Sequence, residues 1–149
     1  MSARLAAIKN FDILNGNGLG VSIWYAGCPF ACEGCHNKEF WGMNTGYLLE
    51  EKHYELVERL LSNEAITNLS ILGGEPLLKR NYASLERFIA IANKLNKEVW
   101  LWTGFEYEEV KHLVFLKYVN YLIDGKYDIN QHEITRYKGS KNQKIYKLK

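Results

Sequence analysis

Short apolar runs alternate with amphipathic stretches along the chain. Four of these runs are rich in β-branched or aromatic residues and predict buried strands: Val21–Ala26, Ile66–Leu72, Val99–Trp102 and Val119–Ile123. The first is also bounded by glycines on both sides. A sheet built from strands of this kind is expected at the centre of the protein.

The stretches between the strands predict helices. Two of them place apolar residues on one helical face, the first with Tyr54, Val57, Leu60 and Leu61, the second with Tyr82, Leu85, Ile89, Ala92 and Leu95. A shorter helix is expected from Glu106 to Leu113, because acidic residues stand early in it and basic ones late, as the helix dipole prefers.

Strands that alternate with helices predict right-handed βαβ units around a parallel sheet. The chain has 149 residues, which suits one domain spanning residues 1–149. A closed eight-stranded barrel needs about 250 residues and is excluded. We therefore expect an α/β fold whose sheet is either open and doubly wound or part of a barrel. In both architectures, ligands bind at the carboxyl ends of the strands.

Glycine and polar residues follow each predicted strand directly. In chain order they are Gly27-Cys28, Gly73-Gly74-Glu75-Pro76, Thr103-Gly104 and Asp124-Gly125-Lys126. Each group has an ordinary structural explanation as a turn or a helix cap. Parallel strands, however, would bring all four groups to one rim, where thiols, a carboxylate, a hydroxyl and an Asp/Lys pair would meet.

The three cysteines of the chain, Cys28, Cys32 and Cys35, stand in one Cys-x3-Cys-x2-Cys loop. An odd number this close together is not a disulfide framework and indicates metal or redox chemistry. Structural zinc requires a fourth ligand, for which the adjacent His36 is a candidate. A four-iron cluster ordinarily takes four cysteines, so here one iron would be open to an outside ligand. The third hypothesis is that the cysteines bind no metal and are either reactive thiols or simply buried.

Charge and hydropathy limit the partners and the cellular location that can be expected for the protein. The net charge of +2 does not indicate a nucleic-acid partner. Residues 126–149 carry seven Lys or Arg against two acids, a net charge of +5, which fits either a solvated lysine-rich end or a surface that docks an acidic partner. No run approaches the roughly 20 apolar residues of a membrane span, and no signal-like run follows Met1. We expect a cytoplasmic protein.

These motifs resemble those of the radical S-adenosylmethionine (SAM) enzymes, whose signature is a Cys-x3-Cys-x2-Cys loop after the first barrel strand. Within that superfamily the chain is most similar to the activating proteins of anaerobic ribonucleoside-triphosphate reductases. The resemblance runs from about Asn10 to the end and includes Asn15-Gly16-Asn17-Gly18, Gly73-Gly74-Glu75-Pro76, Trp100-Leu101-Trp102-Thr103-Gly104 and Gly139-Ser140-Lys141-Asn142-Gln143.

The resemblance implies a partial, open parallel β/α barrel with a cluster loop at about 27–37. Cys28, Cys32 and Cys35 would be the catalytic residues that hold a [4Fe-4S] cluster, whose fourth iron binds the amino and carboxylate groups of SAM. The other implied cofactor-binding residues are Gly73, Gly74 and Glu75 for the methionine amino group, Thr103, Asp124 and Lys126 near the ribose or carboxylate, and His36 and Asn37. Gly34 stands where the superfamily usually has an aromatic residue, so His36 is a candidate surface for the adenine.

The implied reaction splits SAM with one electron into methionine and a 5′-deoxyadenosyl radical. That radical would remove a Cα hydrogen from a glycine of the large glycyl-radical reductase subunit, and an electron donor such as a flavodoxin-like protein would supply the electron. Two alternatives remain open. One is another compact radical SAM enzyme, acting on a different glycyl-radical enzyme or on a small deazapurine-type molecule. The other is a non-catalytic zinc or iron–sulfur binding module.

Overall fold

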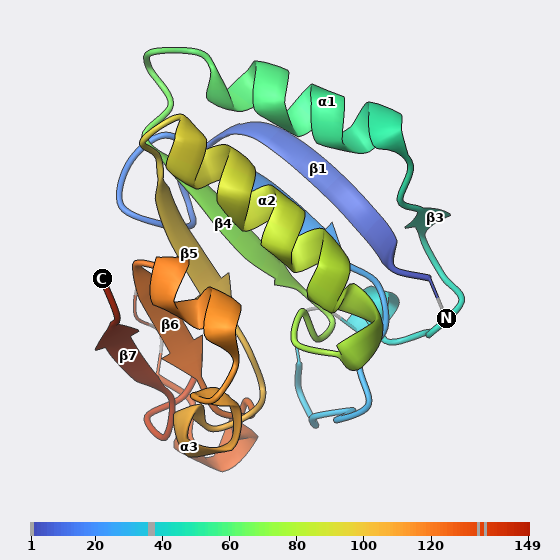
Figure 1. The fold of residues 1–149 in the computed structure, drawn as a ribbon. Coiled ribbons are helices and arrows are strands. Elements are labelled where there is room, and N and C mark those ends of the chain that lie inside the picture. Colours follow the sequence, from blue (N-terminus) through green and yellow to red (C-terminus); the bar gives the residue numbers. More distant parts are fainter. Residues whose placement is uncertain (1, 36–37, 134, 136) are drawn as a thin grey trace.

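The computed structural model describes residues 2–35, 38–133, 135 and 137–149. Seven strands form one sheet in the order β3-β1-β2-β4-β5-β6-β7 (Figure 1). The strands are β1 (Arg4–Asp12), β2 (Gly20–Tyr25), β3 (Tyr47–Leu48), β4 (Asn68–Gly73), β5 (Glu98–Trp102), β6 (Tyr121–Asp124) and β7 (Lys144–Lys147). The α-helices are α1 (Glu51–Leu61), α2 (Tyr82–Lys94) and α3 (Tyr107–Val110), and the 3-10 helices are η1 (Lys38–Phe40), η2 (Lys79–Asn81), η3 (Val114–Tyr118) and η4 (Ile129–Gln131).

The four predicted strands are confirmed as the centre of the sheet. Strands β2, β4, β5 and β6 are neighbours and run parallel. The last of them begins at Tyr121 rather than at Val119, because the Val119 N–H still bonds the Leu116 carbonyl at the end of η3 (3.0 Å). Their carboxyl ends therefore lie at one edge of the molecule, as the sequence predicts.

The predicted parallel arrangement is confirmed for these four strands and does not extend to the outer ones. Strand β1 pairs antiparallel with β2, β3 with β1, and β7 with β6, so the sheet is mixed and open, and the partial barrel is not confirmed. These outer strands lack the continuous apolar pattern of the central ones because one face or edge of each meets solvent. The end of the basic C-terminal segment forms β7 and so belongs to the sheet. Lys144 and Lys147 lie exposed on this edge strand, where lysines oppose edge-to-edge pairing with another sheet.

Helices α1 and α2 lie side by side across one face of the sheet (Figure 1). Their predicted apolar faces are confirmed, since Val57, Leu61, Leu85, Ile89 and Ala92 are buried in the core. Alternate strand residues pack beneath them, among them Val21, Leu69 and Val99, which are register neighbours on β2, β4 and β5. Every second strand residue thus faces the helices, as the alternation of side chains along a strand requires.

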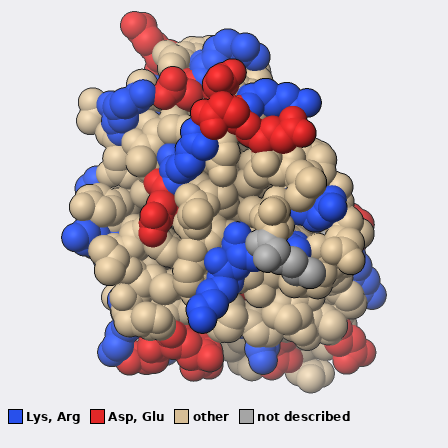
Figure 2. Space-filling model, turned by 45° about the vertical axis from the view of Figure 1, so that its right-hand side comes forward, with Lys and Arg blue, Asp and Glu red and all other residues tan. Residues whose placement is uncertain are grey.

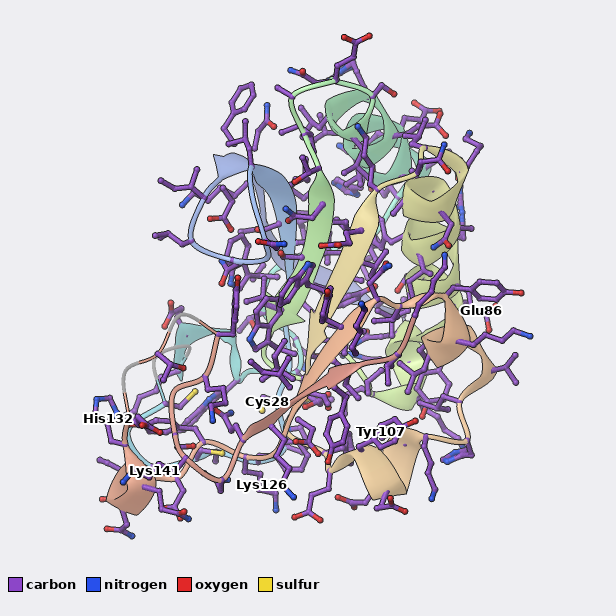
Figure 3. The ribbon with its side chains drawn as sticks, turned by 90° about the vertical axis from the view of Figure 1, so that its left-hand side faces the viewer. Cys28, Glu86, Tyr107, Lys126, His132 and Lys141 are labelled. Carbon is purple, nitrogen blue, oxygen red and sulfur yellow. The ribbon has the colours of Figure 1, made fainter. Side chains whose placement is uncertain are left out.

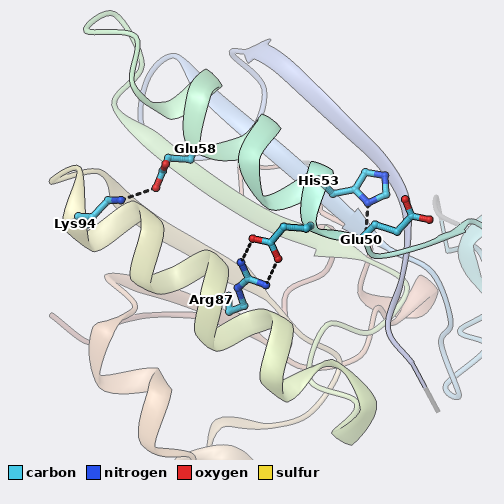
Figure 4. A network of polar contacts seen from close by, with 6 residues as sticks. Glu50, His53, Glu58, Arg87 and Lys94 are labelled. Carbon is cyan, nitrogen blue, oxygen red and sulfur yellow. Dashed lines mark hydrogen bonds and ion pairs between the residues drawn. The ribbon is translucent and has the colours of Figure 1, made fainter.

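The outer surfaces of α1 and α2 carry paired charges. Arg87 donates to both carboxylate oxygens of Glu51 at 2.9 and 2.7 Å, and Lys94 pairs with Glu58 (Figure 4). Acidic and basic side chains are likewise interspersed over the face that Figure 2 shows. None of the helices in the described part of the chain has the length and apolar character that crossing a bilayer requires.

Helix α3 is shorter than predicted and ends at Val110 instead of Leu113. Its first turn is fixed by a capping box between Glu106 and Glu109, and the Tyr107 N–H donates to Asp124 Oδ2 at 2.8 Å. This contact ties the start of α3 to the end of β6, so the loop after β5 is held against the loop after β6.

The sheet face opposite α1 and α2 has a different character. Ser22, Ser70, Trp100 and Tyr121 are register neighbours across β2, β4, β5 and β6, and Trp100 stacks on Tyr121 with ring centroids 4.2 Å apart. This mixed polar and aromatic face leads to the carboxyl ends of the same strands.

Candidate functional site

A cavity of about 150 Å³ opens at the carboxyl ends of β2, β4, β5 and β6. Figure 3 shows Cys28 and Lys126 at this end of the sheet, below the tips of the strands. Eight of the predicted site residues line the cavity together: Cys28, Cys32, Cys35, Gly73, Gly74, Glu75, Thr103 and Lys126. The sequence expectation that the four strand ends meet at one rim is therefore confirmed for these residues.

The cysteine loop leaves β2 through a sharp turn. Gly27 has φ +99°, and a Cβ there would lie 2.6 Å from an Arg80 guanidinium nitrogen. That guanidinium donates to the carbonyls of Ala26 (2.8 Å) and Met43 (2.7 Å), and the Cys28 N–H donates to the Trp41 carbonyl (3.1 Å). Arg80 thus joins the start and the return of the loop and fixes the place of the first cysteine.

The thiols are half-buried and meet backbone donors. Sγ of Cys28 accepts hydrogen bonds from the backbone of Phe30 and Ala31, and Sγ of Cys32 accepts one from the backbone of Tyr127. Burial nevertheless raises the pKa of the Cys28 and Cys32 thiols, so both are protonated at neutral pH in the metal-free protein. Binding of a metal centre must release these protons.

The three thiols line one cavity, together with the Gly73–Glu75 turn. A [4Fe-4S] cluster bonds each cysteine at a different iron, so it needs sulfurs that surround one body rather than one point. Three cysteines on one cavity wall, with N–H donors to two of their sulfurs, meet that need.

Gly73 and Glu75 join β4 to the cysteine loop and to β5. A Cβ at Gly73, which has φ +132°, would lie 2.2 Å from the Tyr25 carbonyl oxygen, so only glycine fits beside β2. The Glu75 N–H donates to the Gly27 carbonyl at 2.7 Å. The Glu75 side chain is fully buried and accepts three hydrogen bonds, from Leu77 N–H (2.8 Å), Thr103 Oγ1 (2.7 Å) and Gly104 N–H (2.6 Å).

The burial of Glu75 makes the stability of the protein depend on pH. Burial raises its pKa from 4.5 to about 7, although the three donors oppose this. Between these values the folded protein keeps a proton that the unfolded chain has released. The contribution of Glu75 to the free energy of unfolding should therefore be largest below pH 4.5 and fall by about 3 kcal/mol as pH rises to 7.

Urea unfolding at several pH values between 4.5 and 7.5 measures this effect. Glu75→Gln, which does not titrate, is the reference. We expect the wild-type stability to decline relative to the variant over this range, and parallel pH profiles would contradict the assignment.

The remaining predicted residues have different surroundings. Thr103 is buried, and its hydroxyl, which donates to Glu75, also accepts from Phe105 N–H (3.1 Å). Asp124 is buried beside the cavity-lining Gly125, and its oxygens accept the N–H groups of Tyr107 (2.8 Å) and Lys144 (3.2 Å). Lys126 is exposed at the rim. The predicted cofactor-binding residues His36 and Asn37 lie outside the described residues.

The cavity has further walls that residue-level prediction did not assign to the site: Phe30, Leu72, Trp102, Gly104, Gly125, Tyr127 and Gln143. Gly104 and Gly125 could have been assigned to the site from the sequence, because they belong to the predicted strand ends. Phe30 and Tyr127 could not, since an aromatic residue in a loop is no more typical of a binding site than of the core. Phe30 packs edge-on against Phe105 at 5.0 Å, with the Lys126 ammonium 4.9 Å from its ring centre.

Comparison with known proteins identifies the family to which the chain belongs. The family model described as 4Fe-4S single cluster domain matches residues 14–146. A protein of Enterobacteria phage T4 named anaerobic ribonucleoside-triphosphate reductase-activating protein is 35% identical over 137 residues, covering 91% of this chain and 88% of that protein. Proteins of the same name from Pasteurella multocida and Escherichia coli K12 are 34% and 28% identical, and each alignment covers more than nine-tenths of both chains.

Proposed function

The chain belongs to the 4Fe-4S single cluster domain family together with the anaerobic ribonucleoside-triphosphate reductase-activating proteins, and from this premise we propose that it activates such a reductase. It is a radical SAM enzyme that generates a glycyl radical. The observation that carries the proposal is the meeting of exactly three cysteines with the Gly73–Glu75 turn at one cavity.

Three protein ligands suit a catalytic cluster. Cys28, Cys32 and Cys35 would hold the [4Fe-4S] cluster, and because the chain has no fourth cysteine, one iron would be available to the amino and carboxylate groups of SAM. Bound there, the cluster would supply the electron for reductive cleavage of SAM, the chemistry by which a glycine Cα hydrogen is removed from the reductase. The protein orients the nucleotide and excludes water and other hydrogen donors.

The protein's own residues position the nucleotide. An ionised carboxylate has about four acceptor sites, and the structure fills three of those of Glu75, so one remains for the methionine ammonium beside Gly73 and Gly74. Thr103 acts by holding Glu75. Lys126, exposed at the rim, pairs with the carboxylate or approaches the ribose. Asp124 fixes the loops after β5 and β6, and Asp124, His36 and Asn37 remain predicted contacts of the nucleotide.

A protein substrate explains the open architecture. We propose that the single domain, with a cluster loop at about 27–37, acts as an incomplete barrel. A glycine loop of a large partner can enter such an open site, and the bound partner then shields it from solvent. The basic segment 126–149 is the proposed contact, through Lys138 and Lys141 beyond the cavity. Binding to the reductase at low salt that is unchanged after both lysines are replaced by glutamine would contradict this contact.

The reaction also needs an electron from outside the chain. All three cysteines are assigned to one cluster, which leaves none for a second cysteine-bound centre. We therefore propose an external donor such as a flavodoxin-like protein, and a reducing compartment, the cytoplasm, in which thiols and cluster survive.

Formation of the product radical tests the function. The reconstituted protein, SAM and a chemical reductant are mixed under anaerobic conditions with the large reductase subunit, and EPR spectra are recorded. A doublet from a glycyl radical is expected, and its absence when SAM is omitted is the control. A doublet formed only on another glycyl-radical enzyme, or none with any such enzyme despite SAM cleavage, would replace the proposed substrate.

A further inference from the structure

Three residues of the C-terminal segment line the cavity beside the cysteines, namely Lys126, Tyr127 and Gln143, and Tyr127 is the aromatic one. We propose that its ring is the surface against which the purine of the bound nucleotide packs, so that Tyr127 is a binding and specificity residue for SAM. The inference rests on the proposed function, because it concerns the same cavity.

Tyr127 is anchored directly to the cluster loop. It lines the cavity together with Cys28, Cys32 and Cys35, and its backbone donates a hydrogen bond to Sγ of Cys32. It stands three residues after the end of β6. Any ligand whose polar end lies at the cysteines and at the Gly73–Glu75 turn must extend its other end along the remaining walls, and Tyr127 belongs to these.

Two glycines lie close to opposite edges of the ring. A Cβ at Gly34, which has φ +75°, would lie 3.3 Å from Tyr127 Cε2 and 2.7 Å from Ile129 Cδ1. A Cβ at Gly139 would lie 3.0 Å from Cδ1 on the other edge of the ring. The absence of side chains at Gly34 and Gly139 leaves room for the ring, and the Tyr127 hydroxyl, 2.8 Å from His132 Nδ1, restrains its outer end.

A fixed ring is suited to a flat base. Purines stack on aromatic side chains, and a ring that is already held loses little entropy when the base arrives. The other aromatic residues that line the cavity are Phe30 and Trp102. The Lys126 ammonium lies over the ring of Phe30, and Trp102 is stacked on Trp100 with ring centroids 6.1 Å apart. The aromatic surface that the cluster loop lacks at Gly34 is supplied by Tyr127 from another part of the chain.

The affinity for SAM tests the assignment. Anaerobically reconstituted wild-type protein, Tyr127→Ala, Tyr127→Phe and Tyr127→Leu are titrated with SAM, and the change in the EPR spectrum of the reduced cluster is followed. Alanine and leucine should weaken SAM binding about five- to a hundredfold, because they remove base stacking, whereas phenylalanine should stay close to wild type. Tyr118→Ala, at a 47% exposed tyrosine outside the cavity, is the matched control and should not change the affinity.

The cluster itself distinguishes a binding role from a structural one. Iron and sulfide content and the EPR spectrum before SAM is added should be the same in all variants. Unchanged SAM affinity in Tyr127→Ala and Tyr127→Leu, or a loss that accompanies loss of the cluster, would overturn the inference. A wild-type protein that holds its cluster and does not respond to SAM would instead overturn the proposed function.

Discussion

Cys32→Ala is expected to abolish reductive cleavage of SAM while the fold is retained. The variant removes one of three cluster ligands, and no other cysteine in the chain can replace it. Loss of a residue that merely supports a metal ligand costs about 10- to 100-fold in activity, so loss of the ligand itself should exceed 100-fold. Cys32 is half-buried in a loop outside the helix-covered core, so the free energy of unfolding of the metal-free protein should change by about 1 kcal/mol or less.

The measurement is the yield of 5′-deoxyadenosine from reconstituted protein with dithionite. Glu33→Ala, at the adjacent exposed position of the same loop, is the control and should retain the wild-type yield. Substantial turnover in Cys32→Ala would mean that Cys32 is not a cluster ligand.

Gly73→Ala should be the most destabilising of the glycine substitutions at the site. The added Cβ would lie 2.2 Å from the carbonyl oxygen and 2.4 Å from the nitrogen of Tyr25, and backbone atoms of a central strand cannot move aside as a side chain can. The left-handed φ of +132° adds strain for any other residue. Together these effects should lower the free energy of unfolding by about 3 kcal/mol or more.

Urea unfolding of the metal-free protein measures this loss. Gly74→Ala is the matched control, because Gly74 also lines the cavity but does not have a positive φ. It should be much less destabilising and should act mainly on SAM binding. Equal stability losses for the two variants would show that the contact with Tyr25 does not set the requirement for Gly73.

Much of the architecture follows from the apolar pattern. The four central strands are short continuous apolar runs because both of their faces are covered, and this pattern is legible in the sequence. The position of the site follows as well, since parallel strands place residues as distant as Cys28 and Lys126 at one edge. The cysteine spacing then predicts the chemistry of that edge.

The outer strands and several side-chain contacts could not be predicted from the sequence in this way. Strands β1 and β7 form through pairing with β2 and β6, and their own composition is half polar. Asp124 stands at a strand end like a ligand residue, and the sequence gives no sign that its oxygens also accept hydrogen bonds from the backbone of Tyr107 and Lys144. Only tertiary structure determines whether a polar group faces the cavity or neighbouring amides.

Tyr127 is the converse case, a residue that lines the cavity but that the sequence did not single out. The sequence shows that the cluster loop has a glycine at position 34, and it suggests His36 as the candidate surface for the adenine but gives no sign of Tyr127. The packing of Gly34 and Gly139 against the ring of Tyr127 depends on how the chain after β6 returns over the cysteines. No local pattern specifies that return.

One titration tests the central claim, which is that the protein leaves one iron of its cluster to SAM. The anaerobic protein is reconstituted with iron and sulfide and reduced, and its EPR spectrum is recorded with increasing SAM while 5′-deoxyadenosine is quantified. We expect about four irons per chain, a spectrum that SAM alters, and cleavage that depends on both reductant and SAM. A protein that binds stoichiometric zinc, or a cluster whose spectrum SAM leaves unchanged with no nucleoside formed, would contradict the account.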